Sequence, residues 1–199
     1  MKKKQLSHRE ERILLLLQKF DFMTRDQLNS YLKLGTIRNT NRILGNLSDY
    51  LMSIRDRYQT IYYLSKLGRA YVDCDTIRKK GNHVQHTIMR NDMWLYYKCP
   101  PDWESEIKVS DGKATVIVDA MFTTFQQHFL EVDHTQTMKE NRIKIERYKA
   151  LKENGLITQK LGQFPTLVWL TTTELRRKQL KEACNSLPSV KVFTVSDIK

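Results

Sequence analysis

The stretch from Thr36 to Leu51, TIRNTNRILGNLSDYL, repeats apolar positions at steps of three and four residues. This spacing predicts a helix whose apolar face is formed by Ile37, Thr40, Leu44, Leu47 and Leu51. The other side carries short polar or cationic side chains, namely Arg38, Asn39, Asn41, Arg42 and Asn46. Such a helix is either a solvated surface helix or one that presents this side to a ligand.

Two helices are predicted before this stretch, and both begin at a capping box. SHRE at 7–10 begins a helix that runs to about residue 20, and TRDQ at 24–27 begins a short one that ends near residue 32. Gly35 then ends the turn, and Thr36 caps the next helix. Two short helices joined by a tight, glycine-containing turn predict a helix-turn-helix unit.

A hairpin is expected next. Residues 52–57 and 60–64 predict two short strands around a turn near residues 57–59. Ser65 then caps one more helix, SKLGRAYV. This order of elements predicts a winged helix, in which the hairpin is the wing and the second helix of the helix-turn-helix enters the major groove of DNA.

The charge of the chain supports a polyanionic partner. The 199 residues carry a net charge of +12, and residues 1–72 contain 14 Lys and Arg against 6 Asp and Glu. Residues 73–199 contain 20 against 16. A basic domain favours nucleic acid. A membrane surface fits less well, because the cations do not lie on one amphipathic helix.

Duplex DNA is therefore the predicted partner. Arginine can bond a guanine edge and asparagine an adenine edge, so the predicted base-reading residues are Arg38, Asn39, Asn41 and Arg42. Backbone phosphates accept hydrogen bonds from hydroxyl and cationic side chains, so the predicted phosphate contacts are Thr36, Arg55, Arg57 and the tail residues Lys2, Lys3 and Lys4.

Other signals bound the class of protein. The apolar run Ile13–Leu17 is too short to cross a bilayer, and no signal peptide is expected. Three widely spaced cysteines cannot all pair internally, which predicts reduced thiols and a cytoplasmic protein. His83 and His86 have no Cys or His cluster nearby, so we interpret them as surface or capping residues.

The second half of the chain predicts an α/β domain, joined to the first by a polar linker. The expected segments are a helix at 83–97, strands at 104–109, 114–121 and 127–133, a helix from Thr137 to about residue 153, a strand at 167–171, a helix at 174–183 and a strand at 190–195. Mixed elements of this kind predict one small sheet covered by helices. The predicted domains are 1–72 and 83–199, with a linker at 73–82.

Acidic residues gather at the ends of two of these strands. Asp119 lies near the end of one strand, and Glu131 and Asp133 lie near the end of the next. Carboxylates two apart on a strand point to the same face. Because clustered like charges are costly without a cation, Asp119, Glu131 and Asp133 are the predicted ligands of a Mg²⁺ ion.

These acids bear on nuclease chemistry. A strand–Asp–strand–Glu-x-Lys arrangement is typical of the restriction-endonuclease-like superfamily, in which the acids hold metal and the lysine positions or activates water. Asp133 stands where that lysine would be, although Lys113 or Lys144 could supply an amine. Alternatively, the acids pair with Arg142, Lys144 or Arg147 and organise the domain.

Several motifs together resemble the replication-relaxation family of plasmid- and mobile-element-encoded proteins. They are YYLSKLGR at 62–69, His86 with Asn91 and Asp92, Trp103 with Glu106, Asp119, FLEVDHTQT at 129–137, and Tyr148. The resemblance implies a winged helix followed by a degenerate restriction-endonuclease-like domain, and a link with plasmid replication and DNA handling. One departure is Val118 before Asp119, where the family usually has proline.

These observations give an α+β protein with three functional hypotheses. The first is a non-catalytic, sequence-specific duplex DNA-binding regulator of transcription, replication or transfer of a plasmid or mobile element. The second is a metal-dependent (Mg²⁺ or Mn²⁺) endonuclease or nickase that the winged helix targets to DNA. The third assigns dimerisation or partner binding to the second domain. We favour the first combined with the third, as a homodimer, and assign no catalytic residue.

Overall fold

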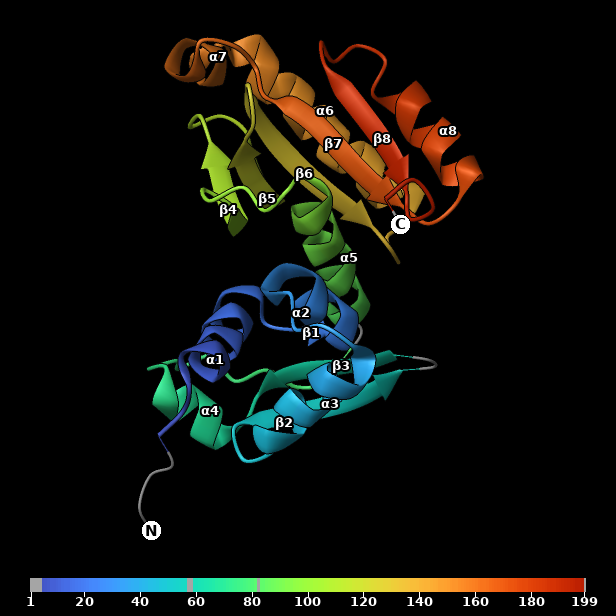
Figure 1. Cartoon of the computed structure of the whole chain (residues 1–199). Helices are drawn as coiled ribbons and strands as arrows, with labels where there is room; N and C mark the ends of the chain where they lie inside the picture. The colour runs from blue at the N-terminus through green and yellow to red at the C-terminus, as the bar shows by residue number, and fades with distance from the viewer. Residues whose placement is uncertain (1–4, 57–58, 82, 199) are drawn as a thin grey trace. The chain divides into compact units, whose positions relative to one another are not determined.

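The structure is a computed structural model that describes residues 5–56, 59–81 and 83–198 (Figure 1). It is a mixed α+β protein, with N-terminal helices beside a small antiparallel sheet and then a five-stranded mixed sheet with helices. The chain divides into two compact units, Met1–Asn91 and Asp92–Lys199. The predicted α+β class is confirmed. None of the described helices is long and apolar enough to cross a membrane.

The first unit contains helices around a three-stranded sheet of order β1-β3-β2. Its elements are α1 (His8–Phe20), β1 (Met23–Thr24), α2 (Arg25–Leu32), α3 (Ile37–Asn46), β2 (Leu51–Asp56), β3 (Gln59–Leu64), α4 (Lys66–Tyr71) and the first part of α5 (His83–Tyr96). β2 and β3 form the predicted antiparallel hairpin, with Ile54 opposite Ile61. The two-residue strand β1 was not predicted.

Short local signals set the helix starts. The capping boxes predicted at Ser7 and Thr24 are both formed, with the Glu10 and Gln27 side chains reaching back to the cap backbone. Thr36 accepts a hydrogen bond from the Asn39 N–H at 3.2 Å and so caps α3. Because each cap satisfies N–H groups that the helix leaves unpaired, these starts can be read from sequence alone.

The α3 helix is shorter than predicted, and its apolar face is shifted. It ends at Asn46, because a tight turn follows and Leu51 begins β2. Its buried residues are Thr40, Ile43 and Leu44, whereas Ile37 is 57% exposed. The prediction that Ile37 faces inward was therefore wrong. It occupies the first helical position, beyond the residues that pack against the rest of the unit.

The beginning of α5 packs on the hairpin and belongs to the first unit. Val84 and Ile88 join a buried cluster with Phe22, Ile54 and Ile61. The side chain of Asn91 donates to the Phe22 carbonyl at 2.7 Å, and that of Gln27 donates to the Ile88 carbonyl at 2.9 Å. These contacts place the beginning of α5 in the first unit, whereas the predicted second domain begins at residue 83.

The second unit is built on one sheet of order β4-β5-β6-β7-β8. Its elements after α5 are β4 (Glu104–Ser110), β5 (Thr115–Thr123), β6 (Gln127–Asp133), α6 (Met138–Asn154), α7 (Leu156–Leu161), β7 (Thr166–Thr171), α8 (Glu174–Ala183) and β8 (Val190–Thr194). β4, β5 and β6 are antiparallel, and β6, β7 and β8 are parallel. The predicted strands and helices are all present; α7 was not predicted.

One face of this sheet carries the main core. Ile145, Tyr148 and Leu151 of α6 and Leu180 of α8 pack against Phe129 and its neighbours on the strands, and α6 and α8 cover that face (Figure 1). On the other face, the Phe122 ring stacks on His128, with ring centres 4.9 Å apart. Every residue of β7 is buried. Since β6 and β7 are covered on both faces, any polar side chain on them needs an internal partner.

Gly68 explains the glycine in the YYLSKLGR motif. The Ser65 N–H and hydroxyl donate to the Tyr50 and Asp49 carbonyls at 2.9 and 2.7 Å, which holds α4 against the turn before β2. A Cβ at Gly68 would overlap the Tyr50 carbonyl oxygen and lie 3.3 Å from Leu64. Because the obstacle is backbone, no side-chain rotation could relieve it.

The first prediction is that Gly68→Ala destabilises the protein by about 1–3 kcal/mol or more through this overlap. The matched control is Gly45→Ala on α3, where an added Cβ would meet nothing within 4 Å. Removing a helical glycine there should stabilise the protein by about 0.5–1 kcal/mol. Urea unfolding followed by far-ultraviolet circular dichroism measures both. Equal midpoints for the two variants would contradict the packing argument.

Candidate DNA interface and acidic site

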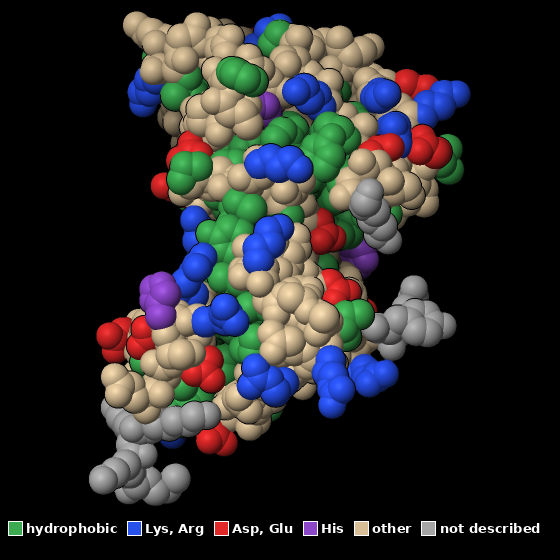
Figure 2. Space-filling model, in the orientation of Figure 1, with side chains coloured by type: hydrophobic (Ala, Val, Ile, Leu, Met, Phe, Trp, Pro, Cys, Tyr) green, Lys and Arg blue, Asp and Glu red, His purple; other side chains and the backbone are tan. Residues whose placement is uncertain are grey.

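The exposed side of α3 carries the predicted base-reading residues. Arg38, Asn41 and Arg42 are all exposed, and α3 contains no acidic residue. Arg38 and Arg42 are four residues apart and therefore lie on the same side of the helix. On the face drawn in Figure 2, Lys and Arg side chains gather over the position that α3 occupies in Figure 1. The result is a cationic surface with short polar side chains, of the types that can bond base edges and phosphate oxygens.

Asn39 is placed differently from its neighbours. Its Nδ2 donates to the Leu34 carbonyl at 2.6 Å, and its Oδ1 accepts from Arg42 Nη2 at 2.9 Å. Asn39 is half-buried, and both ends of its amide are already used. In this arrangement Asn39 braces the turn before α3 and orients the Arg42 guanidinium, and it does not project outward as Arg38 does.

The predicted phosphate contacts are partly on the hairpin. Arg55 is exposed on β2, opposite Thr60 of β3. Arg25, at the start of α2, lies near Tyr62: burial raises the pKa of the Tyr62 hydroxyl, while the Arg25 charge opposes this shift. Arg57, Lys2, Lys3 and Lys4 lie outside the described residues, and their contacts stay predictions. Thr36 is exposed but uses its hydroxyl to cap α3.

In the second unit, Asp119 and Glu131 share a lysine. Lys144 of α6 bonds the Glu131 carboxylate, and its Nζ is 4.0 Å from Asp119 Oδ1. The Tyr148 hydroxyl, one turn further along α6, donates to the other oxygen of Glu131. Asp119 Oδ2 accepts from the Val132 N–H at 2.7 Å. Two carboxylates and one ammonium therefore meet at the point where β5 and β6 separate.

The separation of these strands explains the position of Asp119. Pairing between β5 and β6 runs from Thr123 opposite Gln127 to Ala120 opposite Leu130 and then stops. The N–H of Val132 has left this ladder, so the Asp119 carboxylate takes the place of a strand carbonyl. A side chain held in this way is fixed by the sheet. Asp119 therefore keeps its position beside Glu131.

Opposing influences act on the pKa of Glu131. Its side chain is 2% exposed, and burial followed by the charge of Asp119 raises its pKa well above the usual range, while contacts from Lys144 and Tyr148 act against this rise. Burial and the adjacent Glu131 also raise the pKa of Tyr148, which keeps its hydroxyl protonated as the donor. The pair of acids therefore favours a cation or a proton nearby.

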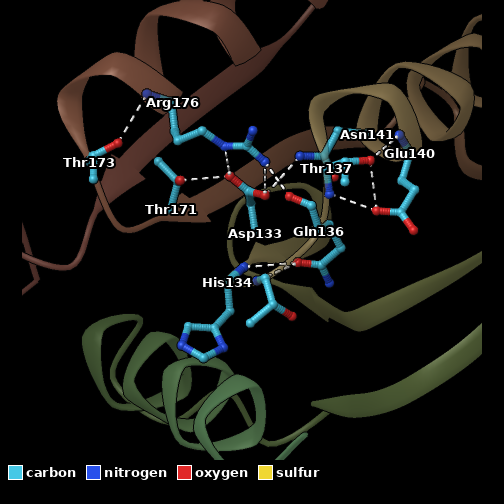
Figure 3. A network of polar contacts seen from close by, with 10 residues as sticks. Asp133, His134, Gln136, Thr137, Glu140, Asn141, Thr171, Thr173 and Arg176 are labelled. Carbon is cyan, nitrogen blue, oxygen red and sulfur yellow. Dashed lines mark hydrogen bonds and ion pairs between the residues drawn. The ribbon is translucent and has the colours of Figure 1, made fainter. Parts of the chain in front are cut away.

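Asp133 belongs to a separate network, shown in Figure 3. Arg176 of α8 binds its carboxylate with two nitrogens, at 2.9 and 2.7 Å. Asn141 of α6 and Thr171 of β7 donate to it at 2.8 Å each. Arg176 also donates to the Gln136 carbonyl at 2.6 Å. Burial alone would raise the Asp133 pKa, but the hydrogen bonds from Arg176, Asn141 and Thr171 bring it below its usual value.

The predicted three-acid metal site is therefore divided. Glu131 and Asp133 do lie on the same face of β6, as expected, but Asp133 is occupied by Arg176, whereas Asp119 and Glu131 share Lys144. Within residues 5–56, 59–81 and 83–198, no three His, Cys, Asp or Glu side chains are grouped so that they could hold a metal ion. The ammonium of Lys144 stands beside the two remaining acids.

A match to a known protein family identifies the family of this chain. The family model described as Replication-relaxation matches residues 14–167. The chain belongs to the replication-relaxation family. No curated protein matches it. The part that matches the replication-relaxation model contains α3, the hairpin and all three acids, together with Lys144 and Tyr148. Arg176 lies beyond the matched residues, on α8.

Sequence reasoning on this replication-relaxation protein identified Lys144 only as one of several partners and missed Arg176. A signal for Arg176 was present. β6 and β7 are parallel, so their carboxyl ends meet at one edge of the sheet. Thr173 caps α8 directly after β7, which puts Arg176 in the first turn of α8 at that edge. A cation there could have been paired with Asp133 once the strand order was known.

The second prediction concerns this ion pair. Arg176→Ala leaves the buried Asp133 carboxylate without its main partner and should lower the free energy of unfolding by about 3 kcal/mol. The neighbouring Arg177 pairs with Glu174 and Asp197, which are 75% and 33% exposed. Arg177→Ala should therefore cost about 1 kcal/mol or less. All three tryptophans, Trp94, Trp103 and Trp169, lie in the second unit, so urea unfolding can be followed by their fluorescence.

The pH dependence has a definite sign. Because the folded-state pKa of Asp133 is lowered, its contribution to stability is fully present above the unfolded value of about 3.9 and is lost as the pH falls through the folded value. The difference between the wild type and Arg176→Ala should thus be full at pH 7 and shrink below about pH 4. A difference that is independent of pH would mean that Arg176 acts through packing alone.

Proposed function

We propose that this replication-relaxation protein binds duplex DNA at specific sequences, with α2 and α3 as a helix-turn-helix and β2–β3 as the wing of a winged helix. The observation that carries this proposal is the exposed side of α3, where Arg38, Asn41 and Arg42 stand together without an acidic residue. Residues 1–72 carry a net charge of +8, which attracts a polyanion over a wide range of approach.

The contacts fall into two groups. Arg38, Asn41 and Arg42 read base edges in the major groove, where bidentate bonds distinguish base pairs. Arg55, with Arg57, Thr36 and the Lys2–Lys4 tail, holds backbone phosphates and fixes the position of the unit on the duplex. Asn39 acts on Arg42 through their 2.9 Å hydrogen bond, which limits the directions in which this guanidinium can point. Preorganised donors lose less conformational entropy on binding.

The second unit has a supporting role in this proposal. It is a restriction-endonuclease-like sheet that no longer cuts DNA and serves as the interface of a homodimer. A protein that reads a two-fold symmetric DNA site usually binds as a dimer. Such a dimer would act in the transcription, replication or transfer of a plasmid or mobile element, as family membership favours. Light scattering of the free protein and of its DNA complex measures the number of chains.

The third prediction tests base reading. After selection of a preferred duplex from a random pool, Arg38→Ala should lose roughly 1–3 kcal/mol of affinity for that duplex and much less for random DNA. Lys66→Ala, which removes an exposed cation from α4, is the control and should change both affinities slightly and equally. Fluorescence anisotropy at fixed salt gives the dissociation constants. Equal losses on both duplexes for Arg38→Ala would remove it from the base-reading group.

A second candidate function rests on Lys144. Asp119, Glu131 and an amine are the groups that a metal-dependent nuclease needs, and Lys144 brings the amine to the two acids. Mg²⁺ in enzymes commonly takes one or two carboxylates and fills its other positions with water and phosphate oxygens. Asp119 and Glu131 fit this requirement. A bound Mg²⁺ would supply Lewis-acid activation of a phosphate, and Lys144 would orient water or a phosphate oxygen beside it.

The fourth prediction separates the two functions with Glu131→Gln. Burial and Asp119 already disfavour the Glu131 charge, so the neutral, equally sized side chain should leave stability within about 1 kcal/mol of the wild type. Supercoiled DNA incubated with Mg²⁺, Mn²⁺ or EDTA shows nicks on an agarose gel. The regulator proposal expects no nicking by either protein. Metal-dependent nicks made by the wild type and not by Glu131→Gln would establish the nuclease instead.

A further inference from the structure

A cleft of about 570 Å³ lies between the first turn of α1, the end of α2 and the second half of α3. Its lining includes three exposed arginines, Arg9 and Arg12 of α1 and Arg42 of α3. Its lining also includes two apolar residues, the buried Ile43 and the half-buried Leu32. All of these residues belong to the first unit. Arg42 is one of the predicted base-reading residues, whereas Arg9 and Arg12 are not among the predicted contacts.

The positive charge of Arg9 and Arg12 is not balanced by an ion pair with another described residue of the chain. Arg9 and Arg12 are exposed, and no hydrogen bond or ion pair joins either guanidinium to another residue in the described part of the chain. The one acid in the lining, Glu10, uses its carboxylate in the capping box, where it accepts from the Ser7 N–H and hydroxyl at 2.9 and 2.8 Å. Three arginines therefore face one acid that is already bonded.

The cleft lies beside the exposed side of α3, and this position indicates which ligand it binds. Arg42 belongs both to the cleft and to the exposed side of α3, so whatever occupies the cleft lies directly beside α3. A helix in the major groove has a sugar–phosphate backbone on each side of it, because the groove is only about 12 Å wide. The hairpin offers Arg55 to one stretch of backbone. Arg9 and Arg12 offer two more cations, on a different element, to another stretch.

We infer that the cleft between α1 and α3 binds backbone phosphates of the duplex that α3 reads, through Arg9 and Arg12. This inference rests on the proposed DNA-binding function and adds two phosphate-contacting residues to it. Guanidinium groups bind phosphate oxygens with two parallel N–H bonds. Arg42, braced by Asn39, stands at the boundary between the phosphate contacts of the cleft and the base contacts of α3.

The fifth prediction is a change in salt dependence. Each phosphate contact contributes about one unit to the slope of log affinity against log salt concentration. The double variant Arg9→Ala/Arg12→Ala should lower the slope by about two and weaken binding by on the order of tenfold or more at about 0.1 M salt, equally for preferred and random duplexes. Arg9→Lys/Arg12→Lys should recover most of the slope. Lys66→Ala, whose single exposed cation lies on α4, is the control for loss of overall charge.

The outcomes distinguish this inference from the proposal on which it rests. If the wild type does not bind duplex DNA, both fail. If the wild type binds and the double alanine variant has the same slope as Lys66→Ala, the cleft does not contact phosphates and only the inference fails. If the double variant loses its preference for the selected duplex, Arg9 and Arg12 read bases and the inference is again overturned. Circular dichroism of each variant confirms that α1 remains folded.

Discussion

A buried carboxylate needs hydrogen-bond donors, and β6 contains two buried carboxylates. The Glu131 and Asp133 side chains are each 2% exposed, on a strand that is covered on both faces. Uncompensated, either charge would cost several kcal/mol, of the order found when buried ion pairs are broken. Their cationic partners, Lys144 and Arg176, come from α6 and α8, which must therefore dock on this face of the sheet in one register. The packing of Ile145, Tyr148 and Leu180 follows from that constraint.

The same acids are used in two different ways. Asp133 is fully occupied by Arg176, Asn141 and Thr171, so it holds structure together and has no position left for a ligand. Asp119 and Glu131 are held by one shared lysine, whose side chain is 26% exposed. The three acids predicted as one cluster therefore separate into Asp133, which is structural, and the Asp119–Glu131 pair beside the partly exposed Lys144.

Features of the fold that depend on neighbouring residues in the chain could be predicted from the sequence. Capping boxes set the starts of α1, α2 and α6, and alternation or apolar runs located the hairpin and the sheet strands. Features that depend on distant residues were missed or misplaced. Ile37 fits the helical period but is 57% exposed, whereas Arg176 is distant in sequence from Asp133 and binds it from α8. The role of Asn39 was also hidden, because its partner is the carbonyl of Leu34 in the preceding turn.

The packing of α5 on the hairpin determines where the protein can be divided. An N-terminal fragment that stopped in the polar segment after α4 would lack Val84 and Ile88, and the apolar face made by Phe22, Ile54 and Ile61 would be bared to water. Two strands that expose such a face are prone to associate with one another. The smallest fragment that keeps this buried cluster therefore extends through Asn91, which makes the beginning of α5 a part of the first folding unit.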